Sequence, residues 1–110
     1  MPDPEPKHIQ IAATAGNRDE ADRIATTLVD RRLAACVQIV GPIRSVYRWQ
    51  GQIEHSEEWL CQIKTTRERY DAVEEAIREI HSYDCPEIIA TPIVAGSAAY
   101  LQWLAEQTTS

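Results

Sequence analysis

The sequence predicts an α+β fold: an antiparallel sheet with two helices on one face, a long hairpin mid-chain and a last short helix. Three observations indicate this fold. Apolar residues alternate on both sides of Gly51, which is typical of two strands joined by a tight turn. Two segments with helical spacing, residues 17–32 and 65–85, flank this hairpin. Strand-like segments open the chain and follow the second helix, so the order is β-α-β-β-α-β-α, that of a ferredoxin-like sandwich with an added C-terminal helix.

The first strand and the first helix are short. Residues 8–13 alternate around Ile9 and Ile11, which predicts a strand. Asn17 offers an N-cap, and Glu20 three residues later completes a capping-box pattern. The apolar residues that follow recur with helical spacing and predict one buried stripe that ends near Arg31: Ala21, Ile24, Ala25, Leu28 and Val29.

The hairpin, residues 33–66, is the most informative segment. Many of its apolar residues occupy odd positions: Val37, Ile39, Ile43, Tyr47 and Trp49 before the turn, and Ile53, Trp59, Cys61 and Ile63 after it. Gly41-Pro42 predicts a bend, because proline cannot donate to a ladder. Arms of about a dozen residues would be about 40 Å long at roughly 3.4 Å per residue. By comparison, a compact domain of this size has a radius of gyration of only about 13 Å. Apolar arms that project from their own domain need cover from another chain, so we expect an obligate oligomer.

The second helix is expected to start near Thr65 or Thr66, and Thr65 and Glu68 fit the pattern of a capping box. Its stripe is Tyr70, Val73, Ala76, Ile77 and Ile80, and Glu74 can pair with Arg78. Pro86 prevents the helix from continuing past Cys85. Residues 87–94 predict a fourth strand, and Pro92 places part of it at a sheet edge. Ser97 can cap the last helix.

Composition and charge argue against several classes of protein. The net charge of −6 argues against general binding to nucleic acids or anionic membranes, and no apolar run is long enough for a transmembrane helix. Three widely spaced cysteines suit free thiols in a reducing cytoplasm. Residues 1–7 are expected to be a disordered lead-in without the apolar core of a secretory signal, and residues 8–110 a single domain.

Two other functions that this fold supports are disfavoured. An RNA-recognition module needs stacking aromatics and a basic segment on its central strands, whereas this chain is acidic and has no Phe. A small phosphatase needs an anion-binding loop after the first strand, and residues 14–18 offer one glycine and one arginine for it.

Several motifs resemble those of the CutA family, the divalent-cation tolerance proteins. Leu33-Ala-Ala-Cys-Val-Gln-Ile resembles the family's "LAACVNI", and Ser45-Val-Tyr-Arg-Trp-Gln-Gly-Gln-Ile its "S-x-Y-x-W-x-G-x-I" hairpin tip. Residues 64–66 and 81–88 resemble its "KT" and "HPYExPEI" segments, and residues 93–104 its closing pattern. The resemblance implies a cytoplasmic homotrimer whose hairpins wrap neighbouring subunits. It also implies a role in the response to metal ions, especially copper, and no enzymatic activity.

The metal candidates are His81, Asp84, Cys85 and Cys36. Imidazole, carboxylate and thiolate form a plausible set of ligands for copper or another divalent ion, and the thiolate favours Cu(I). The competing interpretation of His81 is a helix C-cap, and a lone buried cysteine such as Cys36 is commonly a core residue. The family's proposed ligands also include a cysteine and a second histidine, where this chain has Ala13 and Ile80, so His81 alone carries over from the resemblance.

The alternative function is that of a PII-like trimeric sensor that holds a small anion in clefts between subunits, with Lys64, Tyr83 and Glu57 at the cleft. An enzyme that uses Lys64 and Tyr83 is a third possibility. In each case the large apolar residues of the hairpin are expected to anchor the trimer interface: Tyr47, Trp49, Ile53 and Trp59.

Overall fold

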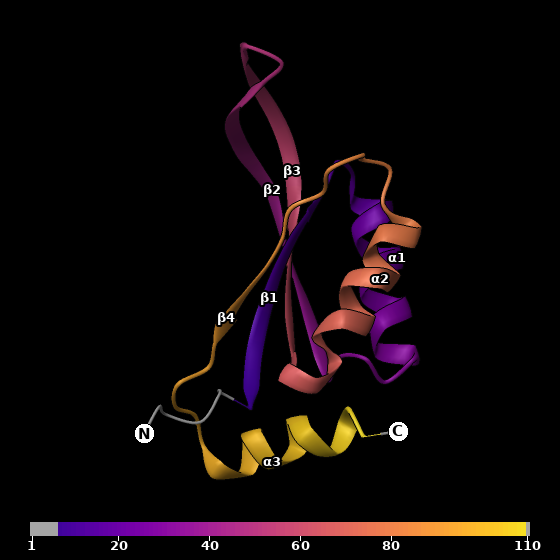
Figure 1. Cartoon of the computed structure of the whole chain (residues 1–110), viewed down its shortest axis with the longest axis vertical. Helices are drawn as coiled ribbons and strands as arrows, with labels where there is room; N and C mark the ends of the chain where they lie inside the picture. The colour runs from indigo at the N-terminus through magenta and orange to yellow at the C-terminus, as the bar shows by residue number, and fades with distance from the viewer. Residues whose placement is uncertain (1–6, 110) are drawn as a thin grey trace.

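The computed structural model describes residues 7–109 and confirms the predicted α+β fold (Figure 1). Of the segment predicted to be disordered, residues 1–7, only Lys7 lies within the described residues. The elements follow in the predicted order, with a short 3₁₀ turn added: β1 (His8–Ala15), α1 (Arg18–Asp30), β2 (Cys36–Trp49), β3 (Gln52–Thr66), η1 (Arg67–Arg69), α2 (Tyr70–Ile80), β4 (Ile88–Pro92) and α3 (Ala98–Gln107).

The sheet has the strand order β2-β3-β1-β4, and each neighbouring pair is antiparallel. β4 is an edge strand, as Pro92 predicts. Helices α1 and α2 cover one face of the sheet, and α3 lies beyond the end at which β1 begins (Figure 1). We refer to the face away from α1 and α2 as the open face.

The core lies between the sheet and these two helices. Its fully buried side chains come from β1, β3, α1 and α2: Ile11, Ile63, Ile24, Leu28, Val73 and Ile77. The predicted stripe of α2 is confirmed, and Glu74 pairs with Arg78 at 3.6 Å. The stripe of α1 was predicted one residue too long, because Val29 is 45% exposed.

The hairpin has the predicted long arms, of 14 and 15 residues, and turns at Gln50 and Gly51, which have φ of 49° and 80°. It projects from the body of the molecule, whose longest extent is 43 Å (Figure 1). The radius of gyration is 14.8 Å, above the roughly 13 Å of a compact chain of this length.

A β-bulge interrupts β2 between Val40 and Ile43, where the Gly41-Pro42 bend was predicted. Before the bulge, Val37 and Ile39 pair with Ile63 and Cys61 on the helix-covered face. After it, Ile43 pairs with Glu58, which shares the open face with Leu60 because strand residues two apart point to the same side. The predicted interruption is therefore confirmed, and the odd positions of β2 change face at the bulge.

The predicted Asn17 N-cap is confirmed, but both predicted capping boxes are wrong. The Glu20 backbone N–H donates to Asn17 Oδ1 at 2.8 Å, but the Glu20 carboxylate accepts from the Ser82 backbone N–H at 2.6 Å and so completes no capping box. Thr65 lies in β3, and its hydroxyl donates to the Leu33 carbonyl at 2.6 Å. α2 begins at Tyr70 without a side-chain cap, so the predicted box of Thr65 and Glu68 is wrong.

Cys61 is in the hydrophobic core, as its register predicts. Burial, and then the charge of Asp22, raises the pKa of its thiol from about 9 to about 11. Between these values the unfolded chain loses the thiol proton first, so the free energy of unfolding must fall as pH rises. We expect a loss of roughly 1 to 2 kcal/mol by pH 10.5 that is absent from Cys61→Ala. Urea denaturation at pH 8 and pH 10.5 measures it, with Cys85→Ala as the control. An equal alkaline loss in wild type and Cys61→Ala would contradict the prediction.

Candidate functional site

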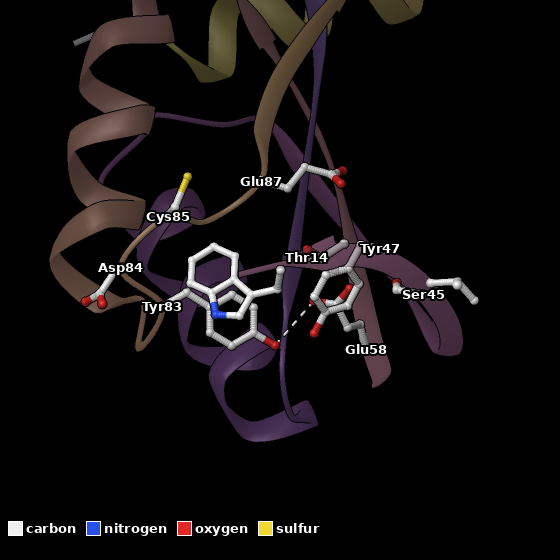
Figure 2. A pocket seen from close by; sticks show the side chains of 10 residues that line it. Thr14, Ser45, Tyr47, Glu58, Tyr83, Asp84, Cys85 and Glu87 are labelled. Carbon is white, nitrogen blue, oxygen red and sulfur yellow. Dashed lines mark hydrogen bonds between the residues drawn. The ribbon is translucent and has the colours of Figure 1, made fainter. Parts of the chain in front are cut away.

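A cavity of about 560 Å³ lies between the hairpin and the loop that joins α2 to β4. β1, β2, β3 and this loop, residues 81–87, all contribute to its wall (Figure 2). The lining residues are Thr14, Ser45, Val46, Tyr47, Trp49, Glu58, Tyr83, Asp84, Cys85 and Glu87. The bulge is what brings Tyr47 and Trp49 to the side of the sheet that carries Glu58.

His81 anchors the start of the loop. Its ring is fully buried, and Nε2 donates to the Thr14 carbonyl at 2.6 Å. Since Nε2 carries the proton, Nδ1 can accept from the Tyr83 backbone N–H at 3.1 Å. The Glu20 carboxylate lies 3.6 Å from Nδ1 and accepts hydrogen bonds from both the backbone and the hydroxyl of Ser82. The loop is therefore tied to both β1 and α1.

Tyr83 crosses from this loop to the hairpin. Its hydroxyl donates to Glu58 Oε2 at 3.3 Å (Figure 2). A Cβ atom at Gly16 would lie 2.8 Å from that hydroxyl oxygen, so the absence of a side chain there makes room for the contact. Burial, followed by the charge of Glu58, raises the pKa of Tyr83 to about 12. The phenol therefore stays protonated at neutral pH and remains a donor.

The structure places the four predicted metal ligands in different parts of the molecule. Asp84 and Cys85 line the cavity, whereas both ring nitrogens of the buried His81 are bonded to the protein. Cys36 lies opposite Lys64 at the start of β2, beside Tyr100 of α3. Within residues 7–109, no three His, Cys, Asp or Glu side chains are grouped closely enough to hold a metal ion.

The three residues predicted for an anion cleft are also separated. Tyr83 lines the cavity, and Glu57 lies with Arg44 and His55 in a second, shallower depression. Lys64 donates to Gln38 Oε1 on β2. Among the described residues that line the larger cavity, none carries a positive charge.

The predicted interface residues fall into two groups. Tyr47, Trp49 and Ile53 are exposed on the distal part of the hairpin. Trp59 instead packs against this chain's own core, with the Arg18 guanidinium 5.8 Å from its ring centre. A Cβ atom at Gly41 would lie 2.2 Å from the Trp59 ring, so only glycine leaves room for it.

Five lining residues were not singled out as site residues by the sequence: Thr14, Ser45, Val46, Glu58 and Glu87. The alternation of β3 could have separated Glu58 from Glu57, since neighbouring strand residues point to opposite faces. The loop's path over the open face has no sequence signal that we can identify.

Comparison with known proteins decides the family. The sequence model described as "CutA1 divalent ion tolerance protein" matches residues 9–107. This chain belongs to the CutA1 family. The CutA1 relatives include a Thermus thermophilus protein named divalent-cation tolerance protein CutA, 42% identical over 98 residues that cover 89% of this chain and 95% of the relative. An Arabidopsis thaliana protein named "Protein CutA, chloroplastic" is 41% identical over 91% of this chain, which spans only 55% of that relative.

The solved CutA1 structures agree with the fold. CutA1 from the psychrotrophic bacterium Shewanella sp. SIB1 superposes with a TM-score of 0.94 at 42% identity, covering 97% of this chain and 100% of that one. In the part of this CutA1 chain that the structure describes, no helix is long and apolar enough to cross a bilayer.

Proposed function

We propose that this chain forms a cytoplasmic homotrimer that binds copper or other divalent metal ions and acts in tolerance of those ions as a binding protein, not as an enzyme. Relatives named for divalent-cation tolerance support the role. The observation that carries the binding is the cavity, whose described wall contains three carboxylates and one thiol and no positive side chain. Free cysteines in the described chain suit a reducing compartment.

The ligands that we propose for the metal are Asp84 and Cys85, neighbours in one loop that both line the cavity. Because no three His, Cys, Asp or Glu side chains are grouped closely enough within residues 7–109, the remaining ligands would come from another copy of the chain. The exposed thiol of Cys85 suits a soft ion such as Cu(I), and the carboxylates suit harder divalent ions. His81 could join this set only after its bonds to Thr14 and Tyr83 break. Cys36 lies too far along the sheet to join it within one chain.

The trimer is supported by apolar surface that this chain leaves uncovered. Val40 and Ile89 on the open face are 45% and 56% exposed, and Tyr100 and Trp103 of α3 are 41% and 40% exposed. Ile53 near the hairpin turn is 62% exposed. Because soluble monomers rarely leave so many large apolar side chains uncovered, copies of this chain are the natural partner.

The metal site is tested by titration of the assembled protein with Cu(I) and Zn(II). We expect Cys85→Ser to weaken Cu(I) binding at least tenfold, which corresponds to about 1.4 kcal/mol, and to affect Zn(II) binding less. Asp84→Asn should weaken both ions, because it removes a charged ligand. Cys36→Ser is the matched control, since it removes a thiol at the other end of the sheet. Cu(I) affinity that is unchanged in both Cys85→Ser and Asp84→Asn would rule out this site.

A further inference from the structure

Glu58 is a buried carboxylate without a cationic partner. The residue is 7% exposed, and its hydrogen-bond partner among residues 7–109 is the Tyr83 hydroxyl at 3.3 Å. That distance is long for an O–H···O bond, which is commonly about 2.7 Å. No ion pair joins Glu58 to a described Lys, Arg or His. Buried charges are normally paired, so an unpaired carboxylate at a cavity wall favours a cation inside it.

The other walls near Glu58 are aromatic. Tyr47, Trp49 and Tyr83 line the same cavity, and Figure 2 shows the Tyr83 hydroxyl directed toward Tyr47 and Glu58. The faces of aromatic rings attract cations, and sets of such rings recognise alkylated ammonium groups. The lining residues supply no competing positive charge.

The size of the cavity leaves room for a cation larger than a metal ion. Its volume is about 560 Å³, within the range of roughly 300 to 1,000 Å³ of pockets for small organic ligands. A metal ion bound at Asp84 and Cys85 would leave most of that volume and the three aromatic rings free. An organic cation would use both the charge of Glu58 and the rings.

We propose that this cavity binds a small organic cation, an alkylated or protonated amine, with Glu58 as its counter-ion and Tyr47, Trp49 and Tyr83 as its aromatic wall. Asp84 and Cys85, the residues proposed for the metal, lie on the other side of Tyr83 from Glu58 in the view of Figure 2. The proposal therefore stands independently of metal binding.

The test is a titration of the assembled protein at low salt with choline and butylammonium as probes. The control ligand is 3,3-dimethyl-1-butanol, the neutral isostere of choline. We expect saturable binding of the two cations and at least tenfold weaker binding of the neutral isostere. Glu58→Gln keeps the shape of the side chain and removes its charge, so it should weaken binding of both cations at least tenfold. Trp49→Leu should weaken choline more than butylammonium, because it removes a ring that attracts the methylated head group.

Two matched control variants test whether the effect is specific to the cavity. Glu57→Gln removes the neighbouring charge, which belongs to the second depression, and should leave the affinities unchanged. Cys36→Ser removes a thiol that lies outside the cavity, at the other end of the sheet, and should also leave them unchanged. Equal binding of choline and its neutral isostere, or wild-type affinity in Glu58→Gln, would overturn the proposal. Absence of saturable binding would overturn it as well.

Discussion

Val40→Asp should dissociate the assembled protein into monomers of 12.4 kDa. Val40 lies on the open face and is 45% exposed in the single chain. If copies of the chain cover this face, the substitution buries a carboxylate without a partner at every copy of the contact. An uncompensated buried charge costs roughly 3 to 5 kcal/mol, enough to shift a micromolar assembly to monomers. Sedimentation equilibrium across a range of concentrations measures the mass.

Val29→Asp is the matched control for this experiment. Val29 is also 45% exposed, but it lies on α1, which covers the other face of the sheet. We expect Val29→Asp to keep the mass of a trimer. A wild-type protein that sediments as a folded monomer would refute the trimer itself. If the Val40→Asp variant remained a trimer, the interface would have to lie elsewhere than on the open face.

His81→Ala should lower the free energy of unfolding by roughly 2 to 5 kcal/mol. The substitution removes a fully buried ring and leaves the Thr14 carbonyl and the Tyr83 backbone N–H without their partners. The unsatisfied, partly buried Thr14 carbonyl costs about 1 to 3 kcal/mol, and the space left by the ring adds to that, whereas water can replace the partner of the exposed Tyr83 N–H. Urea denaturation measures the loss, and hydrogen exchange at Tyr83 reports whether the loop has loosened.

Two comparison variants separate this role from metal ligation. His55→Ala removes an exposed histidine on the hairpin that bonds Arg44, and should change stability by less than about 0.5 kcal/mol. His81→Gln can keep a donor for the Thr14 carbonyl, so it should recover part of the loss. If His81 were a metal ligand in this conformation, the alanine variant would keep its stability and lose copper affinity, which is the opposite of the expected result.

The path of the chain was predictable from the sequence to the extent that local patterns determine it. The helix stripes, the Ser97 cap, the edge position of β4 and the glycine turn all follow from spacing and residue type, and each is present. The capping box at Thr65 was wrong because long-range pairing with Ile9 and the bond to Leu33 keep Thr65 in the sheet. Tertiary contacts there outweigh a local motif.

The candidate site was less predictable, because contacts between distant segments build it. His81 was singled out by its motif, but its partners Thr14 and Glu20 lie more than sixty residues away in the chain. Glu58 looked equivalent to Glu57 until the register placed it opposite Ile43. Lys64 and Tyr83, which were expected at a cleft between subunits, lie apart within one chain: Lys64 bonds Gln38 on β2, whereas Tyr83 lines the cavity.

The bulge at Gly41 and Pro42 divides the hairpin into two parts whose residue types are constrained by different contacts. Below it, β2 side chains such as Val37 and Ile39 complete this chain's own core, so changes there are limited by folding. Beyond it, Tyr47 and Trp49 contribute to a cavity and an exposed surface, where foldability constrains the residue type much less. The residue types of the distal hairpin are therefore set by the ligand or neighbouring chain that they contact, whereas those before the bulge are set by the packing of this chain's own core.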